Sequence, residues 1–327
     1  MVTWLKIALS VVAVIFLLLL ALDICVVSLK KRRKMPENAL GRYFSKNLFR
    51  FNSCVFLSIF SVVWLAPLLI GVIGSFTSQY TFENNPGSLI PSDGFTTQNY
   101  IDLFHKYDTD GTRLPVERWI LNSFIVATVN TALYLLLAGF AAYAFVFLKF
   151  KFRTVVFNVL IFTMVIPGIA TTVPQLANIS RLGIAKSLLA LILPGLGGVG
   201  GMYLIRQFYL SIPKDLIESA GMDGASHFLV FRRIVLPLAK SVFLVQGLFC
   251  FMGSWNDLLW PQLVLGTANK SLWTLQVGIA YVSGSKTANS IGLSLASAMV
   301  SAVPILILYI FTQSKIIDGV AASGVKG

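Results

Sequence analysis

Seven stretches of about 20 or more apolar residues, separated by polar segments, dominate this 327-residue chain. A backbone amide left unpaired in hydrocarbon costs several kcal/mol, and a helix of about 20 residues pairs its own amides across a bilayer. These stretches predict an all-α integral membrane protein, a polytopic helical bundle of about seven spans. We place the spans at residues 4–29, 53–76, 119–148, 155–178, 187–209, 238–265 and 291–314.

Composition supports a membrane protein, since 56% of the residues are hydrophobic and only 12% are charged. Soluble domains carry roughly 25% charged residues. Four prolines, Pro167, Pro174, Pro194 and Pro304, fall inside the apolar stretches. Neighbouring helices can satisfy the backbone groups that a proline frees. We therefore expect bent or broken helices that line a cavity.

The net charge of +13 is unevenly distributed. Numbering the spans alternately puts residues 30–50, 149–153, 205–240 and 315–327 on one side, with 18 of the 26 Lys and Arg residues. Such an excess marks the cytoplasmic side. We predict a multi-pass protein of the cell membrane, with its N-terminus outside and its C-terminus in the cytoplasm. Nucleic-acid binding is disfavoured because no basic face with interleaved aromatic residues accompanies the charge.

The polar segments divide the chain into regions. Residues 1–52 hold an extra N-terminal helix and the basic cluster at 30–34, which suits anchoring at an anionic membrane surface rather than signal-peptide cleavage. Residues 53–118 hold a span and an external loop, in which 95–104 predicts a Thr-capped helix with an apolar face of Tyr100, Leu103 and Phe104. Residues 119–314 form the predicted transport core, and 315–327 a cytoplasmic tail.

The polar segment at 213–237 interrupts the core with two short predicted helices. The first covers 214–222, with Leu216, Ile217 and Ala220 expected on one side. Asp223 is a candidate N-cap for the second helix, at 224–233. Gly224 at the junction permits a tight turn.

The same segment resembles the EAA loop of permease subunits in ATP-binding-cassette (ABC) importers, written E-A-A-x3-G-x9-I-x-L-P, with Ser219 in place of one alanine. The resemblance implies that the loop docks on a cytoplasmic ATPase and transmits its closure. Glu218 would be the charged contact, Asp223 and Gly224 the turn, and Phe228 and Phe231 apolar packing. Glu218, Ala220, Gly224 and Pro237 match the pattern, and Ser219 is the one departure from it. The resemblance assigns all five to the loop that couples the permease to its ATPase.

Two other phrases carry the same resemblance. The end of the chain, 319–327, is similar to the G-x-x-A-G-G-V-K-G tail of the maltose-type permease subunit, with Ser323 replacing a glycine. That tail reaches the ATPase dimer, which implies ATPase contacts for Gly324 and Lys326. Residues 253–261 resemble the W-x-x-N-[DE]-[FL]-x-x-P phrase of sugar permeases, and 96–100 resembles their T-x-x-N-Y segment.

Ionisable groups inside the predicted spans are few, and in a membrane such groups are candidates for function. Trp255, Asn256 and Asp257 combine aromatic and polar groups that can stack on a sugar and hydrogen-bond to it. Together with Gln246 they are our candidates for the substrate pathway. The alternative is structural, with the tryptophans in the interfacial belt and the polar groups paired with helix ends or neighbouring helices.

Catalytic and cofactor motifs are weak. The tail resembles a P-loop only superficially, because a valine separates Gly324 from Lys326 and no Ser or Thr follows. The G-x-G-x-x-G match at 195–200 lies inside an apolar stretch, where close helix packing explains it better than a dinucleotide. We expect no enzyme activity, metal or cofactor in this chain, and ATP and Mg²⁺ on a partner ATPase.

The resemblance implies a binding-protein-dependent permease subunit that imports a carbohydrate, such as an oligosaccharide, by ATP-driven alternating access. Its expected partners are a second permease subunit, two ATPase subunits and an external solute-binding protein. One alternative is an ABC permease for a non-sugar solute. Another is an ion-coupled secondary transporter, a class that usually shows carboxylates or unwound helices near the midplane.

Overall fold

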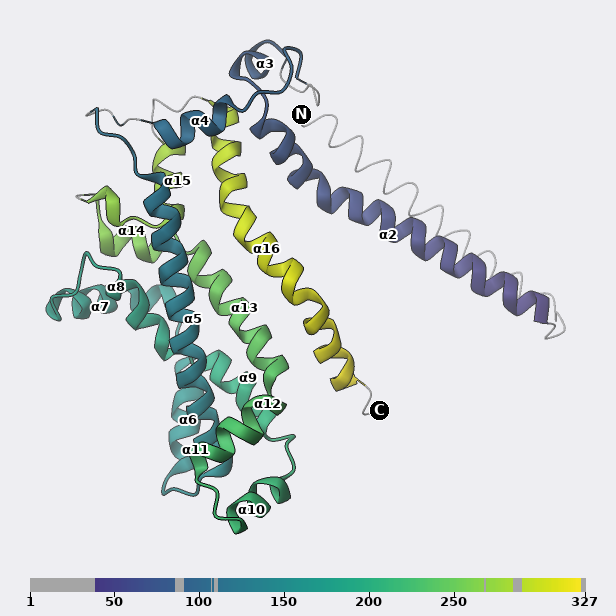
Figure 1. Ribbon diagram of the computed structural model, residues 1–327, viewed down its shortest axis with the longest axis vertical. Coiled ribbons are helices and arrows are strands. Elements are labelled where there is room, and N and C mark those ends of the chain that lie inside the picture. Colours follow the sequence, from purple (N-terminus) through teal and green to yellow (C-terminus); the bar gives the residue numbers. More distant parts are fainter. Residues whose placement is uncertain are drawn as a thin grey trace. The chain divides into compact units, whose positions relative to one another are not determined.

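A computed structural model describes residues 39–85, 91–106, 108, 111–267, 269–284 and 290–324, with the backbone alone for 39–51 and 314–324. The regular elements of these residues are helices, which confirms the predicted all-α class (Figure 1). They form two compact units. The first holds the described residues up to Tyr100 together with Ser290–Met299, and the second holds those of Ile101–Asn289 and those from Val300 onward.

The first unit is organised around the end of one long helix. It contains α2 (Ala39–Ser75), α3 (Gln79–Asn84), the start of α4 (Gln98–His105) and the start of α16 (Ile291–Gly324). The buried Asn99 amide donates to the carbonyl oxygens of Ser75 and Thr77, at 2.9 and 2.8 Å. These bonds satisfy carbonyls left without partners at the helix end. Asn99 of the T-x-x-N-Y phrase therefore caps α2.

The second unit has a long central helix, α5, against which α9 and α13 pack (Figure 1). Its elements are α5 (Val116–Phe147), α6 (Arg153–Thr163), α7 (Gly168–Arg181), α8 (Leu189–Ile192), the 3₁₀ helix η1 (Leu193–Gly197), α9 (Val199–Tyr209), α10 (Lys214–Met222), α11 (His227–Val230), the π-helix η2 (Phe231–Val235), α12 (Leu236–Leu238), α13 (Lys240–Asn256), α14 (Leu259–Leu265), the 3₁₀ helix η3 (Lys270–Leu272), α15 (Leu275–Gly284) and the remainder of α16.

Three described helices are long and apolar enough to cross a membrane: Asn52–Ser75 of α2, α5, and Ile291–Gln313 of α16. Three bent helix pairs raise the number to as many as six. The break between α6 and α7 turns the chain by 101° and ends at Pro167. The segment formed by α8 and η1, which contains Pro194, meets α9 at an angle of 45°, with the bend at Gly198. The expectation of broken helices is thus confirmed. The predicted span at 4–29 lies outside the described residues.

The predicted continuous span at 238–265 is wrong. α13 ends at Asn256, Asp257 is extended, and α14 begins at Leu259. A second break lies near the start of the predicted span, where His227–Leu238 meets Lys240–Asn256 at an angle of 81°. Apolar composition continues through both breaks, so hydropathy alone placed the span across them.

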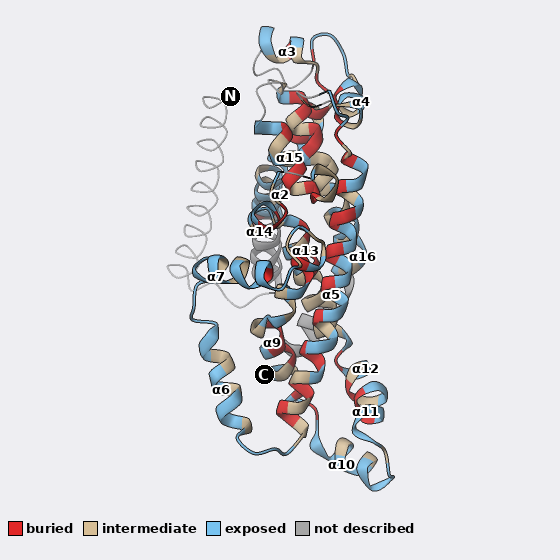
Figure 2. Ribbon diagram, turned by 90° about the vertical axis from the view of Figure 1, so that its left-hand side faces the viewer, coloured by how far each residue is buried: buried red, intermediate tan, exposed pale blue. Residues whose placement is uncertain are grey.

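Close packing of α5 uses small residues on its neighbours, and buried positions follow the length of α5 (Figure 2). A Cβ atom on Gly195 would lie 2.6 Å from the Asn130 amide nitrogen, and one on Gly198 would lie 3.0 Å from the Tyr134 ring. The G-x-G-x-x-G match therefore serves helix packing, as its place in an apolar stretch indicates.

Candidate functional site

The polar loop at 213–237 begins with a helix that ends in a Schellman turn. α10 covers Lys214–Met222, and Gly224 follows it at φ +79°. The Ala225 N–H donates to the Ala220 carbonyl at 3.0 Å, and the Gly224 N–H donates to the Gly221 carbonyl at 3.0 Å. This pattern satisfies the last helix carbonyls and requires a left-handed residue, for which glycine has no Cβ penalty. Gly224 is thus the turn residue that the sequence predicts.

The second helix of the loop is capped differently from our prediction. Asp223 is the C-cap of α10, and its side chain caps no helix in the described loop. Ser226 is the N-cap of α11, where its hydroxyl accepts from the Leu229 N–H at 3.4 Å. The Schellman turn uses the two residues after Met222, which moves the next helix start beyond the position that Asp223 would cap.

One side of the loop is held by the core of the second unit. Ile217 and Ala220 pack against that core, whereas Leu216 is exposed, contrary to our grouping of the three. Phe231 is buried, with its ring 4.6 Å from that of Phe140 and 5.7 Å from that of Tyr143. Phe231 starts a π-helix, a rare form that frequently occurs at functional sites.

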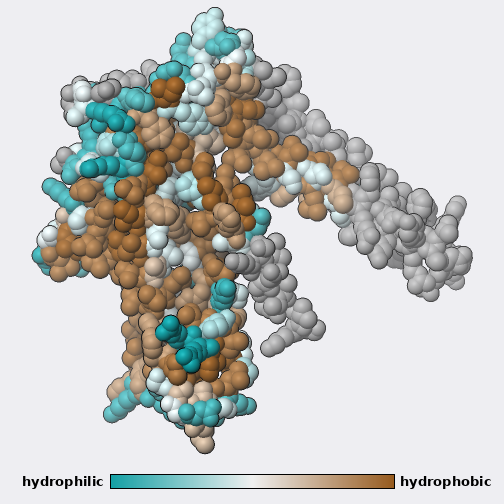
Figure 3. All heavy atoms as spheres, viewed as in Figure 1, coloured by the Kyte–Doolittle hydropathy of each residue, from teal (hydrophilic) through white to brown (hydrophobic). Residues whose placement is uncertain are grey.

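The other side of the loop faces outward. Glu218, Ser219 and Asp223 are exposed. Met222 is 89% exposed and Phe228 is 61% exposed, so Phe228 packs less than we predicted, although its ring lies 6.4 Å from that of Phe140. Figure 3 shows hydrophilic side chains gathered at the end of the molecule that carries α10. A mixture of exposed apolar groups and charges suits a protein interface.

The remaining positions of the predicted coupling site are less informative. Pro237 is exposed and lies in α12, two residues before the bend at Ala239. Gly324 is the last residue of α16. Lys326 lies outside the described residues.

A separate cavity of about 370 Å³ lies among α5, α7, η1, α13 and α14. Its walls mix apolar and polar side chains, and the polar ones include Asn130, Thr172, Gln175, Ser254 and Asp257. Asn130 is buried and donates to the Ser254 hydroxyl at 2.8 Å, while its amide oxygen has no partner among the described residues. The cavity therefore offers hydrogen-bonding groups in an otherwise apolar lining, as small-molecule sites do.

Of the four predicted substrate residues, only Asp257 lines this cavity. Trp255 is 1% exposed, and its indole donates to the Ser301 carbonyl at 3.0 Å, so it is structural. Asn256 is exposed and accepts from the Gln276 amide at 3.4 Å. Gln246 lies against Gly201, where α13 meets α9. Trp260 lines the cavity instead, and its indole donates to the Ala190 carbonyl at 3.0 Å.

The missed cavity residues had only weak sequence signals. Asn130 reads as a polar group suited to pairing between helices, and it does pair with Ser254. Thr172 and Gln175 follow Pro167, the proline at which the chain turns into α7. Polar residues placed just after a proline in an apolar stretch are the pattern that could have identified them.

A search against protein-family models matches residues 134–314 to the binding-protein-dependent transport system inner membrane component. The match covers the bent core helices, the loop at 213–237 and the cavity residues other than Val126 and Asn130. The chain belongs to this family of transport components. It is a membrane subunit of an ABC importer, as predicted, and permease subunits of this kind are not themselves enzymes.

Individual relatives align along most of the chain. The arabinooligosaccharides transport system permease protein AraQ of Bacillus subtilis (strain 168) is 27% identical, over 86% of this chain and 97% of AraQ. The inner membrane ABC transporter permease protein YcjP of Escherichia coli (strain K12) is 29% identical, over 83% of this chain and 94% of YcjP. A solved structure of a bacterial ABC transporter that imports the acidic polysaccharide alginate has a chain with the same fold, at a TM-score of 0.69 and 23% identity, covering 86% of this chain and 99% of that chain.

Proposed function

We propose that this permease subunit imports a carbohydrate, such as an oligosaccharide, into the cytoplasm by ATP-driven alternating access. The 213–237 loop would connect the transport core to an ATPase. The observation that carries the proposal is the loop's two-sided construction. Ile217, Ala220 and Phe231 hold the loop to the core, while Glu218 and Phe228 are exposed for a partner.

The mechanism follows from this construction. Closure of two partner ATPase subunits, which would supply ATP and Mg²⁺, would displace α10, and the Schellman turn would pass the displacement to α11 and η2. Phe231 packs on α5, which lines the cavity through Val126 and Asn130. The loop can shift the equilibrium of the core only because the ATPase holds it differently in its two states. The proposed orientation puts the loop in the cytoplasm.

A carbohydrate is favoured by both the relatives and the cavity. AraQ is named for arabinooligosaccharides. Asn130, Ser254 and Asp257 offer hydrogen-bonding groups for sugar hydroxyls, and Trp260 adds an aromatic side chain. A second permease subunit would complete the cavity, and an external binding protein would deliver the sugar.

Transport in proteoliposomes tests this function. The subunit is purified with its partners, reconstituted, and supplied with binding protein, labelled arabino- or malto-oligosaccharides, and ATP on the loop side. We expect sugar uptake that requires ATP hydrolysis. ATP-driven uptake of a non-sugar solute alone would replace the substrate assignment, and uptake driven by an ion gradient without ATP would contradict the coupling.

A further inference from the structure

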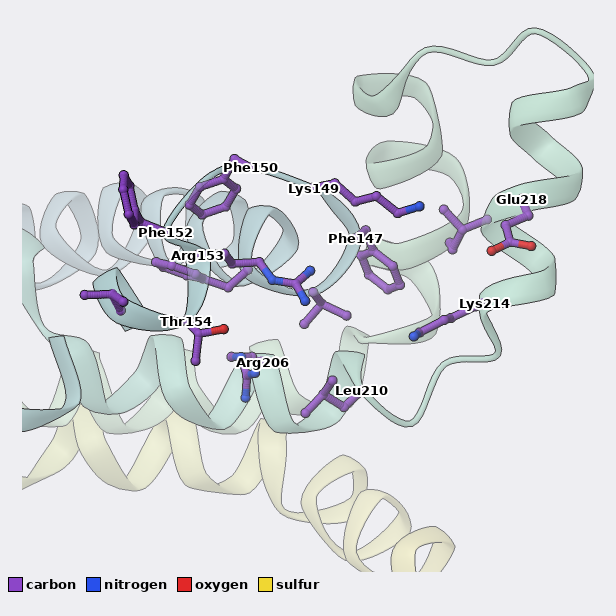
Figure 4. A pocket seen from close by; sticks show the side chains of 14 residues that line it. Phe147, Lys149, Phe150, Phe152, Arg153, Thr154, Arg206, Leu210, Lys214 and Glu218 are labelled. Carbon is purple, nitrogen blue, oxygen red and sulfur yellow. The ribbon is translucent and has the colours of Figure 1, made fainter. Parts of the chain in front are cut away.

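A second cavity, of about 670 Å³, opens beside α10 at the ends of α5, α6 and α9 (Figure 4). Four of its lining side chains are cationic and one is anionic. They come from three segments that are distant in sequence, namely the α5–α6 loop with the start of α6, α9, and α10. These residues are Lys149, Arg153, Arg206, Lys214 and Glu218.

Among the residues that the structure describes, the cations of this basic pocket form no ion pair. The ion pairs among the described residues join Arg113 to Glu117 and Lys270 to Asp108, and neither involves the pocket. Glu218 offsets one of the four cations. A concave surface with three uncompensated positive charges concentrates anions.

Arg206 is the cation of the pocket that stacks on an aromatic ring. Its guanidinium lies over the Phe157 ring, 4.0 Å from the ring centroid. Its Nε is buried and has no hydrogen-bond partner among the residues that the structure describes. A planar guanidinium stacked on a ring keeps its N–H edge for a bidentate acceptor such as phosphate. Arg153 lies nearby, and its Nη1 donates to the Leu148 carbonyl at 3.2 Å.

The rim of the pocket has the composition of a membrane interface. Basic and aromatic residues alternate from Lys149 to Arg153, and Phe152 is 64% exposed. From Val155, which lines the pocket, exposed apolar side chains continue along α6 at Val159 and Phe162. α6 buries none of its residues (Figure 2). Basic and aromatic side chains favour the headgroup level, and an exposed apolar helix favours acyl chains.

We propose that the basic pocket binds the phosphate of an anionic phospholipid headgroup, with an acyl chain along α6. Lys214 belongs to α10, so a phosphate bound in the pocket would hold the coupling helix against α5 and α9. Basic pockets between membrane helices on the cytoplasmic side suit such headgroups. The regulatory effect rests on the proposed coupling function, whereas the binding itself does not.

Lipid retention by the purified complex tests the binding. The complex is extracted from its membrane, exchanged into phosphatidylcholine with a limited amount of phosphatidylglycerol, and its bound lipid is counted by native mass spectrometry. The test variant combines Lys149→Gln with Arg206→Gln. Lys151→Gln is the matched control, because Lys151 lies in the same loop but does not line the pocket.

We expect wild type and K151Q to retain phosphatidylglycerol, and the double variant to bind it at least about tenfold more weakly, since charge-assisted hydrogen bonds are lost. Arg206→Lys should bind with intermediate strength if the planar fork matters. Basal ATP hydrolysis by each complex shows that it is folded and assembled.

Three results would overturn the proposal. Equal retention by all variants would place the lipid elsewhere. Displacement of the bound lipid by inorganic phosphate at millimolar concentration would assign the pocket to a free phosphate. Loss of the ATPase from the double variant, with no lipid on wild type, would assign it to an acidic segment of that partner. Normal sugar uptake by the wild-type complex in each of these cases would leave the proposed function standing.

Discussion

Gly224 is the single residue on which the geometry of the coupling loop depends most. Its φ of +79° lies in the left-handed region, and no atom lies within 4 Å of the place where a Cβ would be. Any penalty of substitution is therefore backbone strain, about 1–2 kcal/mol. We expect Gly224→Val to abolish substrate-stimulated ATP hydrolysis while membrane insertion remains normal.

Two controls separate this strain from side-chain size. Asn tolerates the left-handed region, so Gly224→Asn should retain stimulation. Gly221→Val introduces the same side chain within α10, where space is also open. Normal stimulation in G224V, or equal loss in G221V, would contradict the role of the turn.

Asp257 and Asn256 are neighbours that the structure assigns to different tasks. Asp257 lines the cavity and Asn256 does not. We expect Asp257→Asn to raise the KM of sugar uptake about tenfold, because a charge-assisted hydrogen bond to substrate is weakened. Asn256→Ala should leave the KM unchanged. Concentration-dependent uptake in proteoliposomes measures both, and a larger effect of N256A would remove the cavity from the pathway.

For individual residues, the sequence predicts which positions form a site better than it predicts what each side chain does there. Gly224 was predictable because a left-handed turn favours one residue type. Asp223 and Ser226 are both good N-caps, and the choice between them depends on the Schellman turn that precedes them. Trp255 and Trp260 look alike in a motif, yet only tertiary packing buries the first and leaves the second beside the cavity.

At the scale of elements, a partly buried ion pair joins η3 to the segment before α5. Lys270 pairs with Asp108, whose carboxylate also accepts from the Tyr281 hydroxyl at 2.8 Å. Removing one partner of a fully buried pair costs about 3–5 kcal/mol, because the other charge stays desolvated, whereas an exposed pair contributes up to about 1 kcal/mol. The Asp108 side chain is 5% exposed and that of Lys270 is 26% exposed. We expect Lys270→Met to lower the free energy of unfolding by an intermediate amount, about 2 kcal/mol.

Thermal unfolding of the purified complex measures this loss. Asp108→Asn combined with K270M should recover part of it, because the uncompensated charge is gone. Glu117→Gln breaks the exposed pair with Arg113 and should change stability by less than about 1 kcal/mol. Equal effects of K270M and E117Q would show that burial of the Lys270–Asp108 pair adds no stability.

Helix α3 should be sensitive to acid. Asp93 accepts hydrogen bonds from the hydroxyls of Ser78 and Thr81, which lower its pKa below the ordinary 3.8. A lowered folded pKa means that the stabilisation is present above pH 3.8 and is lost as the pH falls through the folded value. Hydrogen exchange of the α3 amides should accelerate in that acid range. Asp93→Asn should remove this pH dependence, while Glu83→Gln on the same helix should keep it.

The helical class and most span positions could be predicted, because hydropathy follows the cost of unpaired amides in lipid. Pro167 marks the break between α6 and α7, whereas the break before α9 falls at Gly198, after Pro194. The break after Asn256 was missed, since an extended Asp257 between two apolar helices leaves no hydropathy signal. The cavity and the basic pocket depend on residues brought together from distant segments, which no linear pattern reveals.

For the whole molecule, the loop, the cavity and the family membership are those of one component of a transport system. In the proposed mechanism, Ile217, Ala220 and Phe231 hold the loop to the core, and an ATPase attached to the outward side would move it. In the proposed assembly, a second permease subunit would complete the cavity. The proposed mechanism therefore requires a second permease subunit and two ATPase subunits.

Purification of the tagged subunit from its native membrane, with the stoichiometry of its partners, tests this requirement most directly. We expect one related permease subunit and two copies of an ATPase with each copy of this chain. Recovery of the chain alone or as a homo-oligomer, under conditions that preserve other membrane complexes, would contradict it.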